Sequence, residues 1–430
     1  MKQIREILQK YSHETFSSLY IRNYRLYYLG QMISTSGTFM QSVAQAWLVL
    51  QLTHSGTALG ITSALQYVPI LVLGPYGGVI ADRFPKRQIL YITQSISGVL
   101  ALILGVLTAT GLVRVWMVYI LAFCLGLVTI FDNPARQTFY IELVGPDNLR
   151  NAVTLYSTLV NLARIIGPAV AAGLIAGLGL APCFIVNGFS YGAVVIMLAM
   201  MRSEELLVTP PEPRGKGQLV EGFKYVLSSP ILGPVLLVMA IIGTLTFEFQ
   251  VSLPLIAQFT FKGDASSYAF LTGSMGFGAA VGGIFFASRK GITPSKVVTA
   301  ALLFGVMVLA AAFMPTLLLS GIALVAVGIA SINFSSLGNS ILQLESSPRM
   351  RGRVMSFWSV AFLGTTTFGG PIVGWFAQTV GARWGLALGG FAGLGAAALG
   401  AITLRNMQPG PSSASEAHKS GSRRVPPPKV

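Results

Sequence analysis

Residues 142–168 read ELVGPDNLRNAVTLYSTLVNLARIIGP, and residues 345–371 read ESSPRMRGRVMSFWSVAFLGTTTFGGP. Each stretch contains a Glu, an Arg eight positions later, and a Gly-Pro pair seventeen positions after the Arg. The offset between the two copies is 203 residues throughout. The repeated positions are Glu142, Arg150, Gly167 and Pro168 in the first copy, and Glu345, Arg353, Gly370 and Pro371 in the second. Such an internal repeat predicts two halves with one architecture.

Long apolar segments surround both copies of the pattern. A membrane-spanning helix needs about 20 largely apolar residues. We expect such helices near residues 26–52, 58–81, 89–110, 115–130, 152–176 and 182–201, and again near 231–256, 268–286, 297–314, 317–341, 354–376 and 386–404. The predicted fold is therefore an all-α membrane protein with twelve transmembrane helices in two pseudo-symmetric six-helix bundles. Repeats of this kind place a substrate site between the halves near the membrane midplane.

The composition fits a chain built for lipid. Hydrophobic residues make up 53% of it and charged residues only 10%, whereas soluble domains carry about 25% charged residues. The net charge of +15 does not indicate a nucleic-acid partner, because the basic residues recur in short gaps between apolar segments. Cys124 and Cys183 both lie in apolar segments without metal-ligand spacing, which predicts buried thiols and no metal site.

The positions of the 29 Lys and Arg residues predict an orientation. Nearly all of them fall at the termini or in the loops on one side of the predicted membrane. The opposite side holds only Arg114, Lys262 and Arg383, and Arg164 falls within a span. By the positive-inside rule, both termini are expected in the cytoplasm.

The segments outside the spans complete the predicted organisation. Residues 1–25 form a cytoplasmic segment with an interfacial helix, because apolar and basic residues alternate there with helical spacing. Residues 26–201 and 231–404 form the two bundles, joined by a cytoplasmic linker, 202–230, with a second amphipathic helix. Residues 405–430 are rich in Pro, Ser and basic residues and are expected to be a disordered basic tail.

The loop after the second span reads GVIADRFPKR at residues 78–87, which resembles the GxxxDRxGRR loop of the major facilitator superfamily, with Pro85 in place of the usual glycine. FDNPARQ (131–137), ARIIGP (163–168) and RGRVMS (351–356) resemble the enterobactin-exporter and macrolide-efflux group within it. The resemblance covers about residues 19–404. It implies a drug:proton antiporter in a bacterial plasma (inner) membrane that exports small molecules by alternating access. We expect a monomer without a cofactor.

Charged residues at the cytoplasmic ends of the spans form a candidate gate. Asp82 can accept N–H groups at the start of the eleventh span, where the helix dipole favours an anion. The resemblance implies that this contact closes the gate in the outward-facing state; the alternative is a cluster that only sets topology. The predicted gate comprises Gly78, Asp82, Arg83, Arg87, Asp132, Arg136 and Arg353.

Asp132 and Arg136 are one helical turn apart, so they can form a local ion pair or join Asp82 in the gate. The intervening Asn133-Pro134 is expected to end or kink the fourth span. Gly167-Pro168 and Gly370-Pro371 are predicted to bend the fifth and eleventh spans.

Two ionisable residues lie deep in predicted spans. Arg164 is about twelve residues into the fifth span, roughly 18 Å deep, where a guanidinium costs at least about 2.5–3.5 kcal/mol. It is either held in a buried structural ion pair or a clamp of carbonyl groups, or it binds substrate or takes part in coupling. Glu248 lies between Phe247 and Phe249 and is the leading candidate to carry a proton, with an exposed acid at the outer mouth as the alternative. A pair between Arg164 and Glu248 cannot be deduced from the sequence.

Neutral polar residues within the spans predict a moderately polar cavity suited to an amphipathic molecule. Each of them could instead form an interhelical hydrogen bond, worth only about 0.6 kcal/mol on average. The candidates are Gln41, Gln45, Gln66, Asn161, Asn187, Asn333 and Asn339.

Enzyme activity is not expected. The three histidines lie outside the spans, and there is no nucleophile elbow, P-loop or metal-ligand spacing. The predicted function is a secondary transporter that exports amphipathic small molecules, with protons as the coupling ion. One alternative is an exporter dedicated to a siderophore or another secondary metabolite. An alternative of another class is a membrane receptor or scaffold that transports nothing.

Overall fold

The computed structural model describes residues 16–207, 218–286, 292–347 and 350–404, without the side chains of residues 75–82, 218, 219 and 404. The predicted interfacial helix near the N-terminus and the basic tail lie outside these residues. Within the described ranges the chain is helical, and no strand occurs. Residues 22–199 form the N-terminal group of helices: α2 (Arg22–Thr53), α3 (Gly56–Arg83), α4 (Lys86–Ala109), α5 (Val115–Leu178) and α6 (Ala181–Ala199).

The C-terminal group follows a linker helix, α7 (Gln218–Ser228). Its elements are α8 (Leu232–Ile241), η3 (Ile242–Thr246), α9 (Phe249–Leu255), η4 (Ile256–Thr260), α10 (Ala265–Phe286), α11 (Pro294–Ala312), α12 (Leu317–Leu344), α13 (Arg351–Ser359), η5 (Val360–Gly364), α14 (Thr366–Thr379) and α15 (Ala382–Leu404). Two of its spans contain π-helical turns. In the first, η3 precedes the break before α9 and η4 follows α9; in the second, η5 lies between α13 and α14.

Twelve spans can be assigned within the described residues. Ten helical segments there are long and apolar enough to cross a membrane. The segment α5 supplies two spans, because its helix is broken by non-helical backbone at Gly145. The 32-residue helix α2 is long enough for another span but is more polar than the others. The expected fold class is therefore confirmed.

The break between the fourth and fifth spans lies at Gly145, so Asn133-Pro134 does not end the fourth span, which was one of its two predicted effects; a kink there stays a prediction. The helix continues through Pro134 as far as Val144. The chain changes direction where the backbone adopts φ 72° and ψ 173°, a conformation that glycine reaches without a Cβ penalty. Pro146 follows immediately, at a position where a missing N–H costs a new helix nothing.

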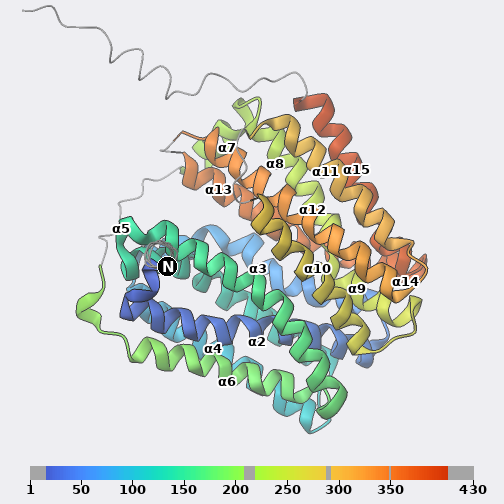
Figure 1. Ribbon diagram of the computed structural model, residues 1–430, viewed down its shortest axis with the longest axis horizontal. Helices are drawn as coiled ribbons and strands as arrows, with labels where there is room; N and C mark the ends of the chain where they lie inside the picture. The colour runs from blue at the N-terminus through green and yellow to red at the C-terminus, as the bar shows by residue number, and fades with distance from the viewer. Residues whose placement is uncertain (1–15, 208–217, 287–291, 348–349, 405–430) are drawn as a thin grey trace, which may run out of the picture.

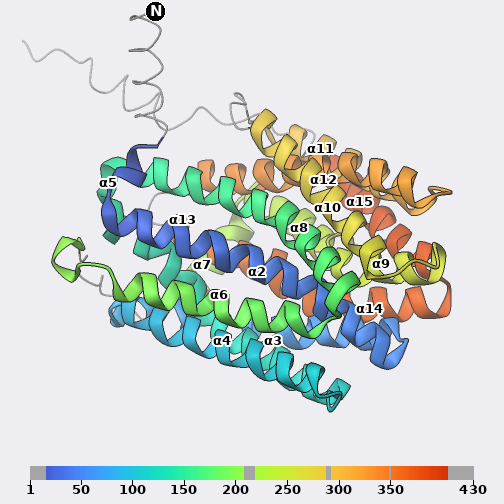
Figure 2. The same cartoon turned by 60° about the horizontal axis from the view of Figure 1, so that its bottom comes forward.

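The two groups of helices lie side by side (Figure 1). They contact each other mainly through two pairs of helices, α3 with α14 and α5 with α10. In both views α9 and α14 lie at one end of the molecule and α7 and α13 at the other (Figures 1 and 2). We call the end with Arg83, Arg87 and Arg353 the basic end, and the end with His54, Lys262 and Arg383 the opposite end.

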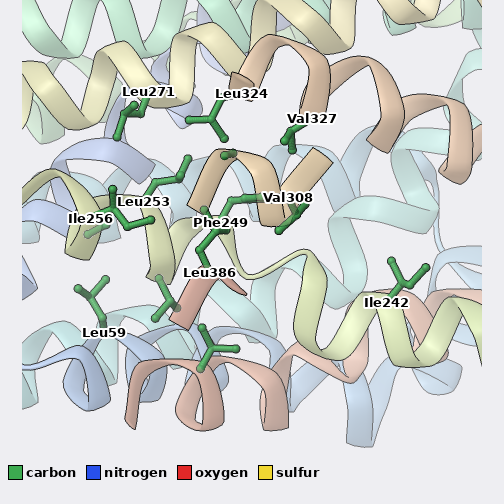
Figure 3. Packing of buried hydrophobic residues seen from close by; sticks show 14 of the residues in the cluster. Leu59, Ile242, Phe249, Leu253, Ile256, Leu271, Val308, Leu324, Val327 and Leu386 are labelled. Atoms are coloured by element: carbon green, nitrogen blue, oxygen red, sulfur yellow. The ribbon is translucent and has the colours of Figure 1, made fainter. Parts of the chain in front are cut away.

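One apolar core crosses between the halves. Leu59 of α3 belongs to the same cluster as Phe249 and Leu253 of α9 and Leu386 of α15 (Figure 3). Near the opposite end, the Trp47 and Tyr268 rings stack with centroids 6.5 Å apart. In the same region Ser55 Oγ donates a hydrogen bond to Gln378 Oε1 at 2.8 Å. Packing at this end therefore joins the two halves.

The seventh span is broken, whereas the sequence predicted one continuous helix over residues 231–256. The π-helical turn η3 precedes Phe247 and Glu248, which are not helical, and α9 begins at Phe249. The eleventh span contains a matching π-helical turn, η5. The two turns contact each other, because a Cβ on Gly243 would lie 2.7 Å from the carbonyl oxygen of Phe362. The break thus lies beside a close contact between the seventh and eleventh spans.

Candidate functional site

Glu248 occupies the break in the seventh span. Its residue is 3% exposed, which places the carboxylate in the interior and not at an exposed mouth. Thr366 at the start of α14 lies beside it, and Oε1 has no hydrogen-bond partner among the described residues. A buried carboxylate with one unpaired oxygen costs free energy unless it is protonated or finds a partner.

Glycines of α14 make room for this carboxylate. A Cβ on Gly369 would lie 2.9 Å from Glu248 Oε1, and one on Gly370 would lie 3.5 Å from Oε2. A Cβ on Gly369 would also overlap the carbonyl oxygen of Thr244 in η3. Gly370, which the sequence predicted to bend the span, packs tightly elsewhere, because a Cβ on it would lie 2.9 Å from the Gly60 carbonyl oxygen of α3.

Aromatic side chains surround the break. The Phe247 ring lies 4.7 Å from the Phe362 ring and 5.1 Å from the Phe304 ring, centroid to centroid. Tyr67 of α3 is near enough to interact electrostatically with Glu248, which brings the N-terminal half to the same place. The carboxylate thus lies where the seventh and eleventh spans of one half meet the second span of the other.

Arg164 lies in the fifth span, where α5 meets α2 and α10. Its guanidinium carbon is 5.8 Å from the centroid of the Phe39 ring. Its backbone contacts α10, because a Cβ on Gly276 would lie 2.7 Å from the Arg164 carbonyl oxygen. Within the described residues the guanidinium forms no hydrogen bond or ion pair, so it does not pair with Glu248. A structural ion pair, one of the two sequence interpretations, is absent from this part of the chain.

The repeated Gly167-Pro168 pair lies one turn further along α5. A Cβ on Gly167 would lie 2.6 Å from the Phe39 Cβ and 2.8 Å from the Ser36 carbonyl oxygen. The glycine therefore lets α5 approach the α2 backbone closely.

A small cavity with polar side chains in its wall lies between α2, α3, α5, α6 and α9, and its volume is about 50 Å³. Its wall includes Gln41 and Gln45, as the sequence predicted. Asn161 instead faces α10, with Nδ2 3.5 Å from the Cβ position of Gly283, and Asn333 is buried in α12. The larger polar residues of the wall are Gln41, Gln45, Gln66, Asn187, Tyr191 and Gln250.

Hydrogen bonds already hold part of this wall. Asn187 Nδ2 donates to Gln41 Oε1 at 2.7 Å, and Ser190 Oγ donates to Asn187 Oδ1 at 2.9 Å. Sequence reasoning had not assigned Tyr191 or Gln250 to the cavity. The position of Gln250 two residues after Glu248 was a signal, but only the helix break explains why its side chain reaches the N-terminal half.

Asp132 and Arg136 form a buried ion pair in the basic end of the N-terminal half. The carboxylate Oδ1 also accepts hydrogen bonds from Thr93 Oγ1 at 2.8 Å and Gln94 Nε2 at 2.7 Å. The Arg136 guanidinium donates to Gln31 Oε1 at 2.8 Å. These contacts join three helices of one half, α2, α4 and α5. The side chain of Asp82, the predicted exchange partner, lies outside the described residues, as does the surrounding of Gly78.

The other predicted gate residues have different partners. Arg87 donates hydrogen bonds to backbone carbonyls at the end of α6, including that of Leu198. Arg83 is exposed. Arg353 Nη1 donates to Glu221 Oε2 at 2.6 Å, which attaches the linker helix α7 to α13.

Comparison with known proteins agrees with this architecture. Residues 13–429 match the model of the transmembrane secretion effector family, whose members belong to the major facilitator superfamily. The chain belongs to this family. It is therefore a multi-pass membrane transporter of the major facilitator type.

Relatives and solved structures extend the comparison. The Enterobactin exporter EntS of Escherichia coli O1:K1 / APEC is 24% identical over 361 residues, which are 82% of this transporter and 84% of EntS. The Staphyloferrin A transporter of Staphylococcus aureus (strain NCTC 8325 / PS 47) is 30% identical over 162 residues, 37% of this chain and 41% of that protein. A bacterial homologue of the iron transporter ferroportin, in an inward-facing state, gives a TM-score of 0.68 at 15% identity and covers 90% of this chain and 99% of its own. That likeness shows the fold alone.

Proposed function

We propose that this transporter exports amphipathic small molecules by alternating access and exchanges them for protons. The observation that carries the proposal is Glu248, a buried carboxylate with an unpaired oxygen at a break in a spanning helix. Such a group can be stabilised by taking up a proton and destabilised by losing it. A proton site at the junction of moving elements is what exchange requires.

The packing of the halves supports alternating access. Near the opposite end, α3 and α14 touch through backbone atoms at Gly60 and Gly370, and at Gly56 and Gly374. Contacts between packed elements of this kind switch between discrete arrangements instead of deforming continuously. We infer that the structure is closed at the opposite end and that transport requires this contact to open.

The proposed setting follows from the charge pattern. We place the transporter in a bacterial plasma membrane, with the basic end and both termini in the cytoplasm. Residues 26–201 and 231–404 act as the two moving bundles, linked by residues 202–230, in a monomer. The Asp132–Arg136 pair and Asp82 with its loop remain our proposal for the cytoplasmic gate.

Proton coupling can be tested in everted membrane vesicles that are energised to an acid interior. A panel of amphipathic compounds, together with enterobactin and staphyloferrin A, is added while the interior pH is followed with a fluorescent amine. We expect at least one compound to release protons from wild-type vesicles. Glu248→Gln should reduce that release about tenfold while substrate exchange without a gradient persists. The matched control is Glu204→Gln, which makes the same change at an exposed residue.

Proton release at the wild-type rate in Glu248→Gln would show that another group carries the proton. Loss of substrate exchange along with proton release would show that Glu248 is needed for structure or binding. Compound binding without any flux would favour the receptor alternative.

Export of one dedicated siderophore or related secreted metabolite is the second candidate, and it is favoured by the similarity to the Enterobactin exporter EntS and the Staphyloferrin A transporter. A deletion strain should then accumulate a single secreted compound, which mass spectrometry of cells and medium would detect. Sensitivity to many unrelated compounds would instead favour broad efflux.

A further inference from the structure

Three glutamine side chains in the wall of the cavity have no hydrogen-bond partner among the residues that the structure describes. Gln45 lies on α2, Gln66 on α3 and Gln250 on α9, and all three line the cavity. Among the described residues, none of these carboxamides takes part in a hydrogen bond, and the polar atoms of Gln45 and Gln66 are not sealed from solvent. Their neighbours Gln41 and Asn187, in contrast, bond to each other. The cavity therefore keeps unused hydrogen-bonding groups.

The wall of the cavity carries no formal charge in the part of the chain that the structure describes. None of the residues that line it is Asp, Glu, Lys, Arg or His. Neither Arg164 nor Glu248 is part of this wall. A charged ligand group would lose its hydration there without gaining an opposite charge, which is costly. A carboxamide offers two donors and an acceptor oxygen, so it suits a neutral group that both donates and accepts hydrogen bonds.

The three carboxamides come from both halves. Gln45 and Gln66 belong to the N-terminal half, whereas Gln250 belongs to the segment that follows the break at Glu248. A ligand held by all three would touch both moving parts of the transporter. Its affinity would then differ between the conformations, which is the condition for a ligand to shift their equilibrium.

We propose that this carboxamide-lined cavity is a subsite for an uncharged group rich in amides or hydroxyls on the transported molecule. The proposal rests on the proposed transport function and narrows its substrate class. It excludes compounds whose charged group must enter this cavity.

A matched pair of fluorescent probes tests the charge preference. Daunorubicin carries a cationic amine, and N-acetyldaunorubicin differs only by the acetyl group that turns this amine into a neutral amide. Binding of each is measured by fluorescence anisotropy to the full-length protein in nanodiscs. We expect the neutral probe to bind at least fivefold more tightly. Equal or tighter binding of daunorubicin, or no measurable binding of the neutral probe, would overturn the proposal.

Substitutions locate the effect. Gln45→Leu and Gln66→Leu should each weaken binding of the neutral probe about tenfold, because each removes donors and an acceptor at similar side-chain volume. Gln51→Leu on the same helix as Gln45, where the side chain is exposed, is the control and should leave binding unchanged. Melting temperatures of the variants should not fall, since the lost carboxamides have no partners. Unchanged binding in both cavity variants would refute the site.

A variant that adds a charge distinguishes a direct effect on ligand binding from a loss of folding. Gln66→Glu should favour daunorubicin over its neutral partner and thus reverse the preference, which a purely structural role would not do. Failure to reverse it would count against the subsite. The proton-release assay with Glu248→Gln measures the proposed transport function independently. The proposed substrate class can therefore be refuted while the proposed transport function is still supported.

Discussion

One added methyl group at Gly60 would test whether the contact of α3 with α14 closes the opposite end. A Cβ at this position would lie 2.2 Å from the Gly370 carbonyl oxygen and 2.7 Å from the Pro371 Cα. A relaxed carbon–oxygen contact needs about 3.3–3.6 Å, so the two helices would have to separate by more than about 1 Å. Both contact atoms belong to the backbone, so no side-chain rotation can relieve the overlap.

The expected cost follows from the overlap. Overpacking of a close-packed interface costs about 1–3 kcal/mol, and a contact between backbones belongs in the upper part of that range. The penalty acts on the closed arrangement alone, because an open one separates the helices. A change of about 2–3 kcal/mol alters the ratio of the two conformations by a factor of about 30–150.

Cysteine cross-linking measures that ratio. Ser55 and Gln378 form a hydrogen bond of 2.8 Å between the halves, so Ser55→Cys with Gln378→Cys reports the closed arrangement. The native Cys124 and Cys183 are replaced by serine to remove other thiols. In this background Gly60→Ala should slow cross-linking at least tenfold.

Gly192→Ala is the matched control. An added Cβ at Gly192 meets no atom within 4 Å, although the change is again glycine to alanine within a helix. Cross-linking at the rate of this control in Gly60→Ala would refute the argument that α3 and α14 form the seal. Slower cross-linking in both variants would point to a general effect of alanine on these helices.

Three further predictions concern charged contacts. Asp132→Asn leaves the Arg136 charge unpaired in a buried site and should lower the free energy of unfolding by about 3–5 kcal/mol, measured as a lower melting temperature in detergent. Adding Arg136→Gln to this variant should recover part of that loss. Arg87→Ala removes the guanidinium that donates hydrogen bonds to the last α6 carbonyls and should lower the free energy of unfolding by about 1–3 kcal/mol. Faster hydrogen exchange at the end of α6 would measure this loss. Glu221→Gln breaks a half-exposed pair with Arg353 and should change stability by less than about 1 kcal/mol, so a larger fall in melting temperature would contradict the assigned exposure.

The positions of the spans were predictable because hydropathy is averaged over about 20 residues. Even the more polar α2 was found, since its glutamines and serines are separated by apolar residues. The break at Gly145 was not found, although Gly145-Pro146 carried the signal for it. The sequence instead indicated Pro134 as the possible end of the fourth span. A single proline does not have to end a long apolar helix when neighbouring helices pack against that helix.

The contact partners of individual side chains were less predictable than the positions of the spans. The two copies of the Glu and Arg pattern suggest equivalent contacts. Yet Glu142 faces Lys86, with Nζ and Oε1 3.6 Å apart, whereas its counterpart Glu345 forms no ion pair within the described residues. The repeat predicts that the two halves share one backbone architecture, but each side chain contacts the residues that lie beside it in its own half. Arg164 makes the same point, because its depth followed from the sequence but its neighbour Phe39 did not.

The broken seventh span could not be derived from one helix alone. Gly243 matters because Phe362 of another span reaches its backbone, and Gly369 matters because Thr244 and Glu248 approach it. These distances depend on two segments more than a hundred residues apart. Sequence composition showed glycines near both positions but could not pair them.

The break joins the proposed proton site to the proposed ligand contact. Glu248 and Gln250 lie two residues apart on a segment that starts at non-helical backbone, so α9 can change direction at Glu248 without breaking helical hydrogen bonds. The carboxylate is held against α14, and Gln250 lines the cavity that the other half completes. We propose that a change in charge at Glu248 alters its fit against α14 and thereby the position of Gln250. Linkage would then require the converse, since a ligand that favours one position of Gln250 would shift proton binding at Glu248 by the same factor. In this proposal substrate and protons are coupled without any direct contact between them, and alternating access turns that coupling into exchange.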